Sequence, residues 1–211
     1  MRASADHHLY GILDLGYVAA TAAAVVATGL LEGGAGLLQL RAKNQPLATI
    51  RRVALTLLPL CRDAGIPFII NDHCAMAADI GADGAHLGQD DGTLAAARAV
   101  LGPDKIIGRS THSLAQARAA LAEGCDYIGF GPLFVTPTKA GRPAIGLHDI
   151  AAMELAVGRH IPAFCIGGIK RCNLTTVLAA GARRVVIVSD LLQVPDVAAA
   201  TSEVCRQLRG F

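Results

Sequence analysis

Short apolar segments alternate with longer Ala- and Leu-rich segments along the whole chain. Polar and apolar side chains do not alternate within the short segments, which is typical of parallel strands that are buried on both faces. We interpret eight of them as strands: Leu9–Leu15, Gly36–Ala42, Pro67–Asp72, Gly84–Gln89, Ile106–Thr111, Tyr127–Pro132, Pro162–Gly168 and Arg184–Leu191. The pattern therefore predicts an α/β fold with a parallel sheet.

The longer segments have the length and apolar spacing of helices. They include Tyr17–Leu31, Pro46–Ala64, Leu94–Leu101, Leu114–Glu123, Leu147–Val157 and Leu174–Ala180. Glycines that suit helix C-termini follow or end several helical segments: Gly65, Gly81, Gly102, Gly124, Gly158 and Gly181. Eight strand–helix repeats favour a closed (β/α)₈ TIM barrel over a doubly wound open sheet, and no GxGxxG follows the first predicted strand.

Length and composition narrow the class further. The 211 residues match a single barrel, which starts at roughly 200 residues, so we expect one domain over residues 1–211. The most apolar segment, Tyr17–Leu31, is short and Ala-rich, ends at Glu32, and lacks a basic leader and a cleavage site. We therefore interpret it as a buried helix and expect no membrane partner.

Charge and cysteine usage also exclude some classes of partner. The formal net charge is +2, and the 19 basic and 17 acidic residues form no run, so nucleic acid is not an expected partner. Six scattered cysteines without a CxxC pair indicate reduced thiols in a cytoplasmic protein. The histidines lack metal-ligand spacing, so zinc is not expected either. The oligomeric state is left open, a homo-oligomer included.

One connection is long for a loop between a strand and a helix. After Pro132 the chain runs to Leu147 before helical periodicity resumes. Barrel active sites lie on the loops at the C-terminal ends of the strands. We therefore predict that residues Leu133 to Ala144 form an active-site lid.

Cations and an amide end the second predicted strand. Alternation along the strand places Gln39, Arg41 and Lys43 on one face, where they would suit an anionic ligand. The alternative is that the two cations are simply solvated at a strand end.

Carboxylates follow the next two strands. Asn71-Asp72 ends the third strand, and Asp90-Asp91 follows the fourth. One or two carboxylates with water and substrate phosphate oxygens make a typical Mg²⁺ site, although ion pairs with Arg and Lys would be a plainer explanation. Cations beside a carboxylate-bound metal are what a pyrophosphate leaving group needs.

Other strand ends offer hydroxyls and glycines. The fifth strand ends with Ser110 and leads to His112, which we leave out of the catalytic set because a lone His at a strand end is usually structural. The seventh ends at Gly168 and the eighth passes Val188 and Ser189, where barrels often hold phosphate on backbone N–H groups. A Gly-Gly pair alone can also be a plain turn. The barrel mouth thus offers two anion sites, for two phosphorylated substrates or one with phosphate at both ends.

The motifs that carry a family resemblance run nearly end to end. They are Leu9-Tyr10 through Asp14, Gln39 through Lys43, Asn71-Asp72, Ala82 through Asp91, Ser110, Tyr127 through Pro132, Thr136-Pro137-Thr138-Lys139 and Ile166 through Ile169. In this set and order the sequence resembles the thiamine phosphate synthase family. The resemblance implies a transferase of thiamine biosynthesis that joins hydroxymethylpyrimidine diphosphate to hydroxyethylthiazole phosphate and releases pyrophosphate with the help of Mg²⁺.

The resemblance also implies a role for individual residues. Pyrimidine diphosphate would be bound by Gln39, Arg41, Lys43, Asn71, Ser110 and Lys139, the metal by Asp72 and Asp91, and thiazole phosphate by Thr136, Thr138, Gly168, Val188 and Ser189. Arg41, Lys43, Ser110 and Lys139 form the expected catalytic set. An amino group on the pyrimidine can push electrons toward the methylene carbon, so neutralising the diphosphate permits ionisation without an enzymic nucleophile.

Three residues depart from the family pattern, and two other functions compete. Val135 replaces a usual Pro, Arg184 a usual Gly, and Asp190 a usual small residue beside the phosphate site, where we expect its carboxylate to point away. A thiazole tautomerase of the same fold could use His112 as a proton shuttle, but would not need the diphosphate and metal residues. A non-catalytic phosphate sensor would be expected to lack the metal carboxylates or Lys139.

Overall fold

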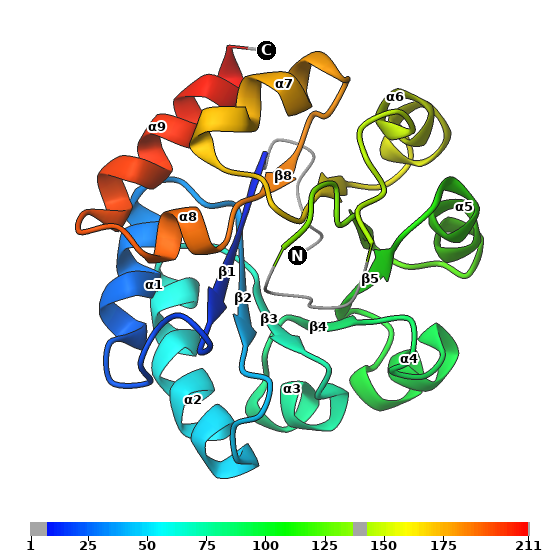
Figure 1. Ribbon diagram of the computed structural model, residues 1–211. Coiled ribbons are helices and arrows are strands. Elements are labelled where there is room, and N and C mark those ends of the chain that lie inside the picture. The colour runs from blue at the N-terminus through cyan, green and yellow to red at the C-terminus, as the bar shows by residue number, and fades with distance from the viewer. Residues whose placement is uncertain (1–7, 137–142, 211) are drawn as a thin grey trace.

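The computed structural model describes residues 8–136 and 143–210. Its eight parallel strands close into a barrel in sequential order, with β8 paired to β1 (Figure 1). The strands are β1 (Leu9–Asp14), β2 (Leu37–Arg41), β3 (Phe68–Asn71), β4 (Gly84–Leu87), β5 (Ile106–Thr111), β6 (Tyr127–Phe130), β7 (Ala163–Cys165) and β8 (Val185–Val186). The predicted (β/α)₈ barrel is confirmed.

Helices surround the barrel and cover its outer face (Figure 1). They are α1 (Ala23–Glu32), α2 (Leu47–Asp63), α3 (Cys74–Ile80), α4 (Leu94–Leu101), α5 (Leu114–Ala122), α6 (Ile150–Met153), α7 (Leu174–Ala179), α8 (Ser189–Leu192) and α9 (Val197–Arg209). A π-helical turn, Glu154–Gly158, continues α6, and a 3₁₀ turn, Arg171–Asn173, precedes α7. Among the described residues, no helix combines the length and apolarity needed to cross a membrane.

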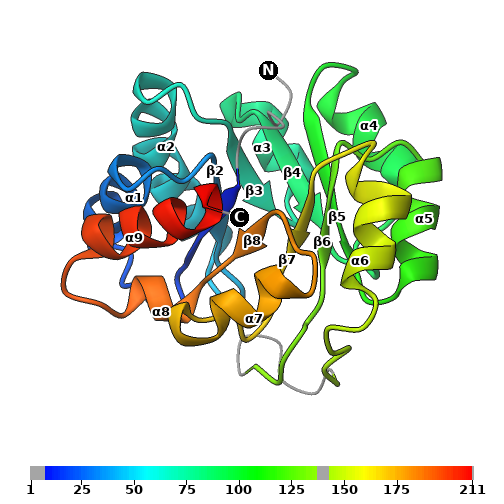
Figure 2. The same cartoon turned by 90° about the horizontal axis from the view of Figure 1, so that it is seen from above.

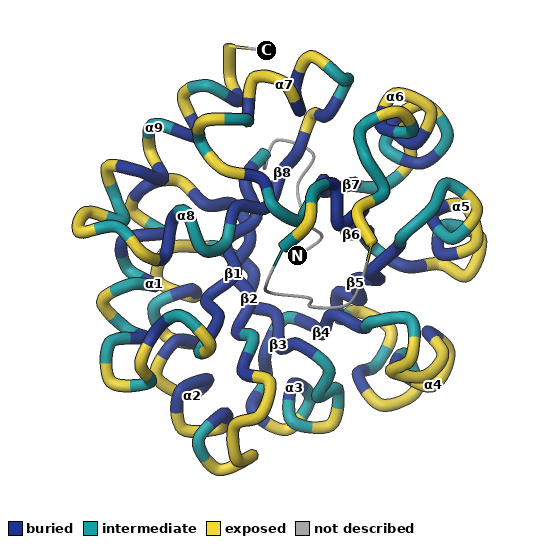
Figure 3. Tube along the Cα trace, in the orientation of Figure 1, coloured by how far each residue is buried: buried dark blue, intermediate teal, exposed yellow. Residues whose placement is uncertain are grey.

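The core has two layers, one between strands and helices and one inside the barrel. The burial-coloured trace shows buried strands within a ring of helices whose outer faces are exposed (Figure 3). Inside the barrel, the rings of Tyr10, Tyr127 and Phe164 pack edge to face with centroids 5.2 to 5.9 Å apart. Such aromatic pairs add to the stabilisation from burial. The three rings fill the barrel beneath its C-terminal mouth.

The eighth strand is much shorter than the sequence predicts. The predicted strand Arg184–Leu191 is wrong beyond Val186, because the backbone turns at Val188 (φ −101°, ψ −87°) and Ser189–Leu192 is helical. A short apolar run fits a strand and a buried helical turn equally well. The helices α8 and α9 are additional to those predicted, and α3 was indicated only by the glycine that ends it, Gly81.

Most of the predicted helix-ending glycines have the expected backbone conformation. Gly81 has φ 71° and caps α3, and Gly65, Gly102, Gly124 and Gly181 also have positive φ. Gly158 is the exception, because it lies in the π-helical turn without a positive φ. A Cβ at this position would lie 2.0 Å from Glu154 Oε2, so a larger residue there would require the Glu154 carboxylate to move.

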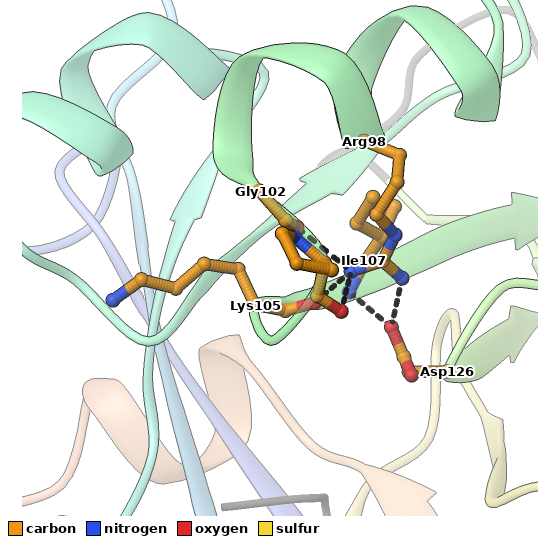
Figure 4. Close-up of polar contacts among 6 residues, drawn as sticks. Arg98, Gly102, Lys105, Ile107 and Asp126 are labelled. Atoms are coloured by element: carbon orange, nitrogen blue, oxygen red, sulfur yellow. Dashed lines mark hydrogen bonds and ion pairs between the residues drawn. The ribbon is translucent and has the colours of Figure 1, made fainter.

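Aspartates just before β4 and β6 secure the starts of the preceding strands. Asp83 Oδ2 accepts from Phe68 N at 2.9 Å, and Asp126 Oδ2 accepts from Ile107 N at 2.8 Å. Arg98 Nη2 also donates to Asp126, at 2.7 Å, while Arg98 Nη1 donates to carbonyls of the turn between α4 and β5 (Figure 4). This cluster lies at the N-terminal ends of the strands, away from the barrel mouth.

We expect Asp126→Ala to lower the free energy of unfolding by about 2 kcal/mol, because it removes the acceptor of the buried Ile107 amide. Urea unfolding followed by circular dichroism measures the change. Asp79→Ala is the matched control, since Asp79 pairs with Arg51 on the exposed surface, where such pairs contribute little. Equal losses in the two variants would show that the strand-start hydrogen bond is unimportant.

Candidate active site

A cavity of about 160 Å³ opens among the C-terminal ends of the strands. It brings together most of the residues predicted to bind substrate: Gln39, Arg41, Asn71, Ser110, Thr136, Gly168, Val188 and Ser189. Helix α8 and the described parts of the loop between β6 and α6 lie at this same end of the barrel (Figure 2). Lys43 is not in the lining, and Thr138 and Lys139 lie outside the described residues.

Arg41 is held in place by a buried carboxylate. Its Nη1 donates to Asp14 Oδ2 at the end of β1, and the Asp14 side chain is only 2% exposed. Asp14 Oδ1 also accepts from the backbone N of Gly16, at 2.9 Å. A buried ion pair with this extra hydrogen bond restricts the guanidinium to one orientation. Arg41 therefore enters the cavity as an oriented cation.

The two predicted metal ligands, Asp72 and Asp91, lie within hydrogen-bond reach of each other. Burial raises the pKa of the Asp72 carboxyl, and the negative charge of Asp91 raises it further. Burial also acts against the Asp91 carboxylate, but hydrogen bonds from Gly88 N, at 2.6 Å, and from Asp72 outweigh it, so the pKa of Asp91 is lowered. The opposite shifts of the two pKa values follow from the mutual repulsion of two converging carboxylates.

Cations surround the carboxylate pair. Lys43 Nζ lies 3.5 Å from Asp72 Oδ2, so the third polar residue of the β2 end reaches this pair and not the cavity. Arg109 donates to the carbonyls of Gly92, at 2.8 Å, and Gln89, at 3.3 Å, and so braces the loop that carries Asp91.

The donor set fits Mg²⁺. Among the described residues, no group of three or more His, Cys, Asp or Glu side chains comes together. Mg²⁺ usually takes one or two carboxylates and completes its shell with water and substrate phosphate oxygens, so Asp72 and Asp91 suffice. A divalent cation would be attracted by both carboxylates and would offset their mutual repulsion.

A chain of buried side chains crosses the barrel beneath the cavity, and three of its members, Tyr10, Tyr127 and His86, were not assigned to the site by the sequence analysis. Gln39 Nε2 donates to Tyr10 Oη, which lies 2.8 Å from Tyr127 Oη. His86 Nδ1 lies 3.0 Å from Tyr127 Oη, and His86 Nε2 lies 2.9 Å from Ser110 Oγ. The signal that could have revealed them is a polar side chain inside an otherwise apolar buried strand.

The glycine turn after β7 packs against the start of the predicted lid. Gly167 and Gly168 have φ 96° and 67°, and a Cβ on Gly168 would lie 2.6 Å from Phe134 Cβ. Leu133 N and Phe134 N donate to the carbonyls of residues 166 and 167, at 2.9 and 3.0 Å. Glycine is therefore required here by backbone conformation and by close packing, in addition to the predicted approach of a phosphate.

Two of the three departures from the family pattern lie away from the cavity. The carboxylate of Asp190 accepts from Arg171 N and Nε, both at 3.0 Å, and Asp190 does not line the cavity, so its carboxylate points away from the cavity, as we expected. Arg184 is buried at the start of β8, at the end of the barrel opposite the cavity. Val135 lies at the cavity rim with 83% of its surface exposed.

His112 is fixed by the backbone and lies outside the cavity lining. Its Nδ1 bonds to the carbonyl of Gly131, and its backbone N donates to Gln116 Oε1 at 2.7 Å. This arrangement is consistent with the structural role that kept His112 out of the catalytic set.

Comparison with known proteins shows to which family the chain belongs. Residues 9–191 match the family described as thiamine monophosphate synthase. The chain belongs to the thiamine monophosphate synthase family. This confirms the resemblance predicted from the sequence motifs. Family membership by itself does not test the individual residue roles, which stay predictions.

Relatives from the thiamine monophosphate synthase family cover most of this chain. A thiamine-phosphate synthase of Gloeobacter violaceus is 45% identical over 166 residues, which are 79% of this chain and 48% of that protein. One of Thermus thermophilus is 43% identical over 180 residues, 85% of this chain and 86% of that protein. The chain thus spans about half the length of the relatives from Gloeobacter and Nostoc.

A solved structure shares both the fold and the family. The thiamine phosphate pyrophosphorylase of Pyrococcus furiosus superposes with a TM-score of 0.85 at 31% identity, over 97% of this chain and 96% of that one. The barrel described above is therefore a fold already found for the thiamine monophosphate synthase family.

Proposed function

We propose that this chain is a transferase that couples an aminopyrimidine diphosphate to a thiazole phosphate, giving thiamine phosphate and pyrophosphate. The observation that carries the proposal is the convergence of two kinds of anion-binding group on one barrel mouth. The carboxylate pair Asp72 and Asp91 stands with Lys43 beside one part of the mouth, and glycine turns and hydroxyls line the other. The named activity of the relatives supports this assignment.

In this mechanism the pyrimidine diphosphate lies toward the ends of β2 to β5. Gln39, Asn71 and Ser110 would hold the pyrimidine, while Arg41 and Lys43 would neutralise the diphosphate. Asp72 and Asp91 would hold Mg²⁺, which when bound supplies further positive charge against the leaving group.

The bond-breaking step then needs no enzymic nucleophile. The amino group of the pyrimidine pushes electrons as the methylene–oxygen bond breaks, and the bonding pair leaves with pyrophosphate. Arg41 contributes by being fixed before this charge develops, because Asp14 already orients it. The thiazole nitrogen donates its lone pair to the methylene carbon and forms the new bond.

The thiazole phosphate would lie on the opposite side of the mouth. Thr136, Gly168, Val188 and Ser189 line this side of the cavity. We propose that Thr138 and Lys139, from the predicted lid, complete the two binding sites, with Lys139 reaching the diphosphate when the lid closes. Exclusion of water by such a lid would protect the cation from hydrolysis.

A direct assay tests the proposal. Purified protein with Mg²⁺, the pyrimidine diphosphate and the thiazole phosphate should release pyrophosphate and form thiamine phosphate in equal amounts. Omission of either substrate is the control. Isomerisation of a thiazole without pyrophosphate release would contradict the proposal and favour a tautomerase.

We expect His112→Ala to keep the kcat of coupling within about tenfold of the parent, the size of one lost hydrogen bond. The reason is that the ionisation requires no imidazole base, and His112, which does not line the cavity, bonds to the carbonyl of Gly131. Steady-state pyrophosphate release measures it. Complete loss of activity in a folded variant would point to proton-transfer chemistry at His112 instead.

We also propose that residues 1–211 act as one domain in the cytoplasm. All six cysteines lie in the part of the chain that the structure describes, and all are free thiols there. Free thiols suit a reducing compartment. The two phosphorylated substrates are the proposed partners, and whether the chain forms a homo-oligomer is left to measurement.

A further inference from the structure

Two segments of the chain form the side of the cavity that we assign to thiazole phosphate. One follows β7 and comprises residues 166–170, and the other follows β8 and includes Val188 and Ser189. In the part of the chain that the structure describes, β7 and β8 are paired in register only at Cys165 and Val185. The sheet therefore does not set the distance between the two segments at the mouth.

A hydrogen-bonded ion pair joins the two segments at their outer ends. Arg171 and Asp190 are each the first residue after the lining of their segment. Asp190 Oδ2 accepts from both the backbone N and the Nε of Arg171, at 3.0 Å each. Because one of these donors is a backbone amide, the carboxylate holds the chain itself and not only a side chain. The pair therefore connects the two segments at a level where the strands no longer do.

Hydrogen bonds within the segment after β7 extend this constraint to the glycine turn. Lys170 N donates to Asn173 Oδ1, at 2.8 Å, and Asn173 Nδ2 donates to the carbonyl of Gly168, at 3.1 Å. Arg171 lies between Lys170 and Asn173 in the sequence. A movement of Arg171 would therefore also disturb the position of Gly168.

We propose that Asp190 and Arg171 are positioning residues, which form a clamp that fixes the distance between the two segments before the phosphate of the thiazole substrate binds. This rests on the proposed function, and it assigns a role to two residues that do not line the cavity. A site that is already ordered binds more tightly, because the ligand does not have to order the chain on binding.

The charge of Asp190 alone would have the opposite effect on binding. A carboxylate near a bound phosphate repels it, so removal of the carboxylate would strengthen binding if only charge mattered. Removal of the clamp should weaken binding instead. Asp190→Asn separates the two effects, because both hydrogen bonds from Arg171 end on one oxygen, and the amide keeps one acceptor oxygen while losing the charge.

Calorimetric titration of thiazole phosphate measures the effect on binding. Asp190→Ala is expected to raise the Kd about tenfold, and Asp190→Asn to keep it within about twofold of the parent. Glu203→Ala is the matched control, since Glu203 Oε2 lies 3.8 Å from Arg171 Nη1 and its loss leaves both bonds to Asp190. This control should bind like the parent.

The pyrimidine diphosphate, titrated with Mg²⁺, shows whether the effect is local. It should bind the parent and all three variants alike, because its proposed site lies toward β2 to β5. Unchanged or tighter binding of thiazole phosphate by Asp190→Ala would overturn the proposal. An equal loss of both ligands would also overturn it, since this would indicate general damage to the barrel.

Hydrogen exchange followed by mass spectrometry, without any ligand, tests the clamp independently of the proposed function. Peptides covering residues 166–171 and 187–192 should exchange about tenfold faster in Asp190→Ala, and at the parent rate in Asp190→Asn and Glu203→Ala. Equal rates in the parent and Asp190→Ala would overturn the clamp. If the parent did not bind thiazole phosphate, the proposed function and the ligand of the clamp would be overturned, while the exchange rates would still decide whether Asp190 holds the two segments together.

Discussion

Asp72→Asn is expected to lower kcat/KM for coupling by about 10³-fold, because a neutral amide is a poorer Mg²⁺ ligand and the diphosphate loses its counter-charge. The backbone should tolerate the change. Asp72 has φ 65°, and Asn is among the few residues that adopt this left-handed conformation readily. Loss of activity in this variant would therefore report on chemistry and not on folding.

Thermal unfolding with and without Mg²⁺ gives a second measure that needs no catalysis. Mg²⁺ should raise the Tm of the parent by binding the folded state, and should raise that of Asp72→Asn much less. Asp104→Asn is the control, since Asp104 is an exposed carboxylate in the turn between α4 and β5. Thiazole phosphate should bind Asp72→Asn almost as it binds the parent. Loss of both ligands in a folded variant would indicate one phosphate ligand that spans the mouth.

The sequence predicted the barrel because the apolar run that marks each buried strand is repeated along the chain and does not depend on which individual side chains touch. Strands buried on both faces read as continuous apolar runs, and β5 has the predicted bounds, Ile106–Thr111. The same signal failed at Ser189–Leu192, where four residues are too few to show helical periodicity.

The site was predictable where polar residues lie at strand ends. Gln39, Arg41 and Asn71 follow from the rule that barrel ligands bind at the C-terminal ends of strands, and all three line the cavity. Asp14 and His86 were not assigned roles, because their partners lie on strands far away in sequence. Only the closure of the barrel reveals that Asp14 reaches Arg41 and that His86 joins Tyr127 to Ser110.

Structural constraints also change what a substitution at Gly168 would mean. The sequence argument makes Gly168 a place where the backbone approaches a phosphate. Because the residue also has φ 67° and packs against Phe134, a branched side chain would strain the turn whether or not phosphate binds. Gly168→Val would then confound folding with binding, and a substitution of the nearby Ser189 hydroxyl is the cleaner probe of that side of the mouth.

Arg41→Lys is expected to lower kcat/KM by about 10²-fold while the protein stays folded, the effect of losing one oriented donor. Lysine keeps the positive charge, so Asp14 is not left as an unpaired buried carboxylate, a change that would itself be strongly destabilising. What is lost is the planar fork of donors, with which one guanidinium can bind Asp14 and an anion at the same time. Lysine has a single ammonium group to divide between them.

The matched control makes the same chemical change in an exposed ion pair. Arg51 pairs with Asp79, and the two side chains are 48% and 59% exposed. Arg51→Lys should leave both stability and kcat/KM unchanged, because exposed pairs contribute little and Arg51 lies on the outer helix α2. Steady-state kinetics with each substrate varied would locate the loss. If Arg41 acts on the departing diphosphate, Arg41→Lys should lower kcat/KM for the pyrimidine diphosphate and leave the KM for thiazole phosphate unchanged. If only the kinetic parameters for thiazole phosphate changed, Arg41 would act on the thiazole phosphate and not on the departing diphosphate, which would contradict the prediction.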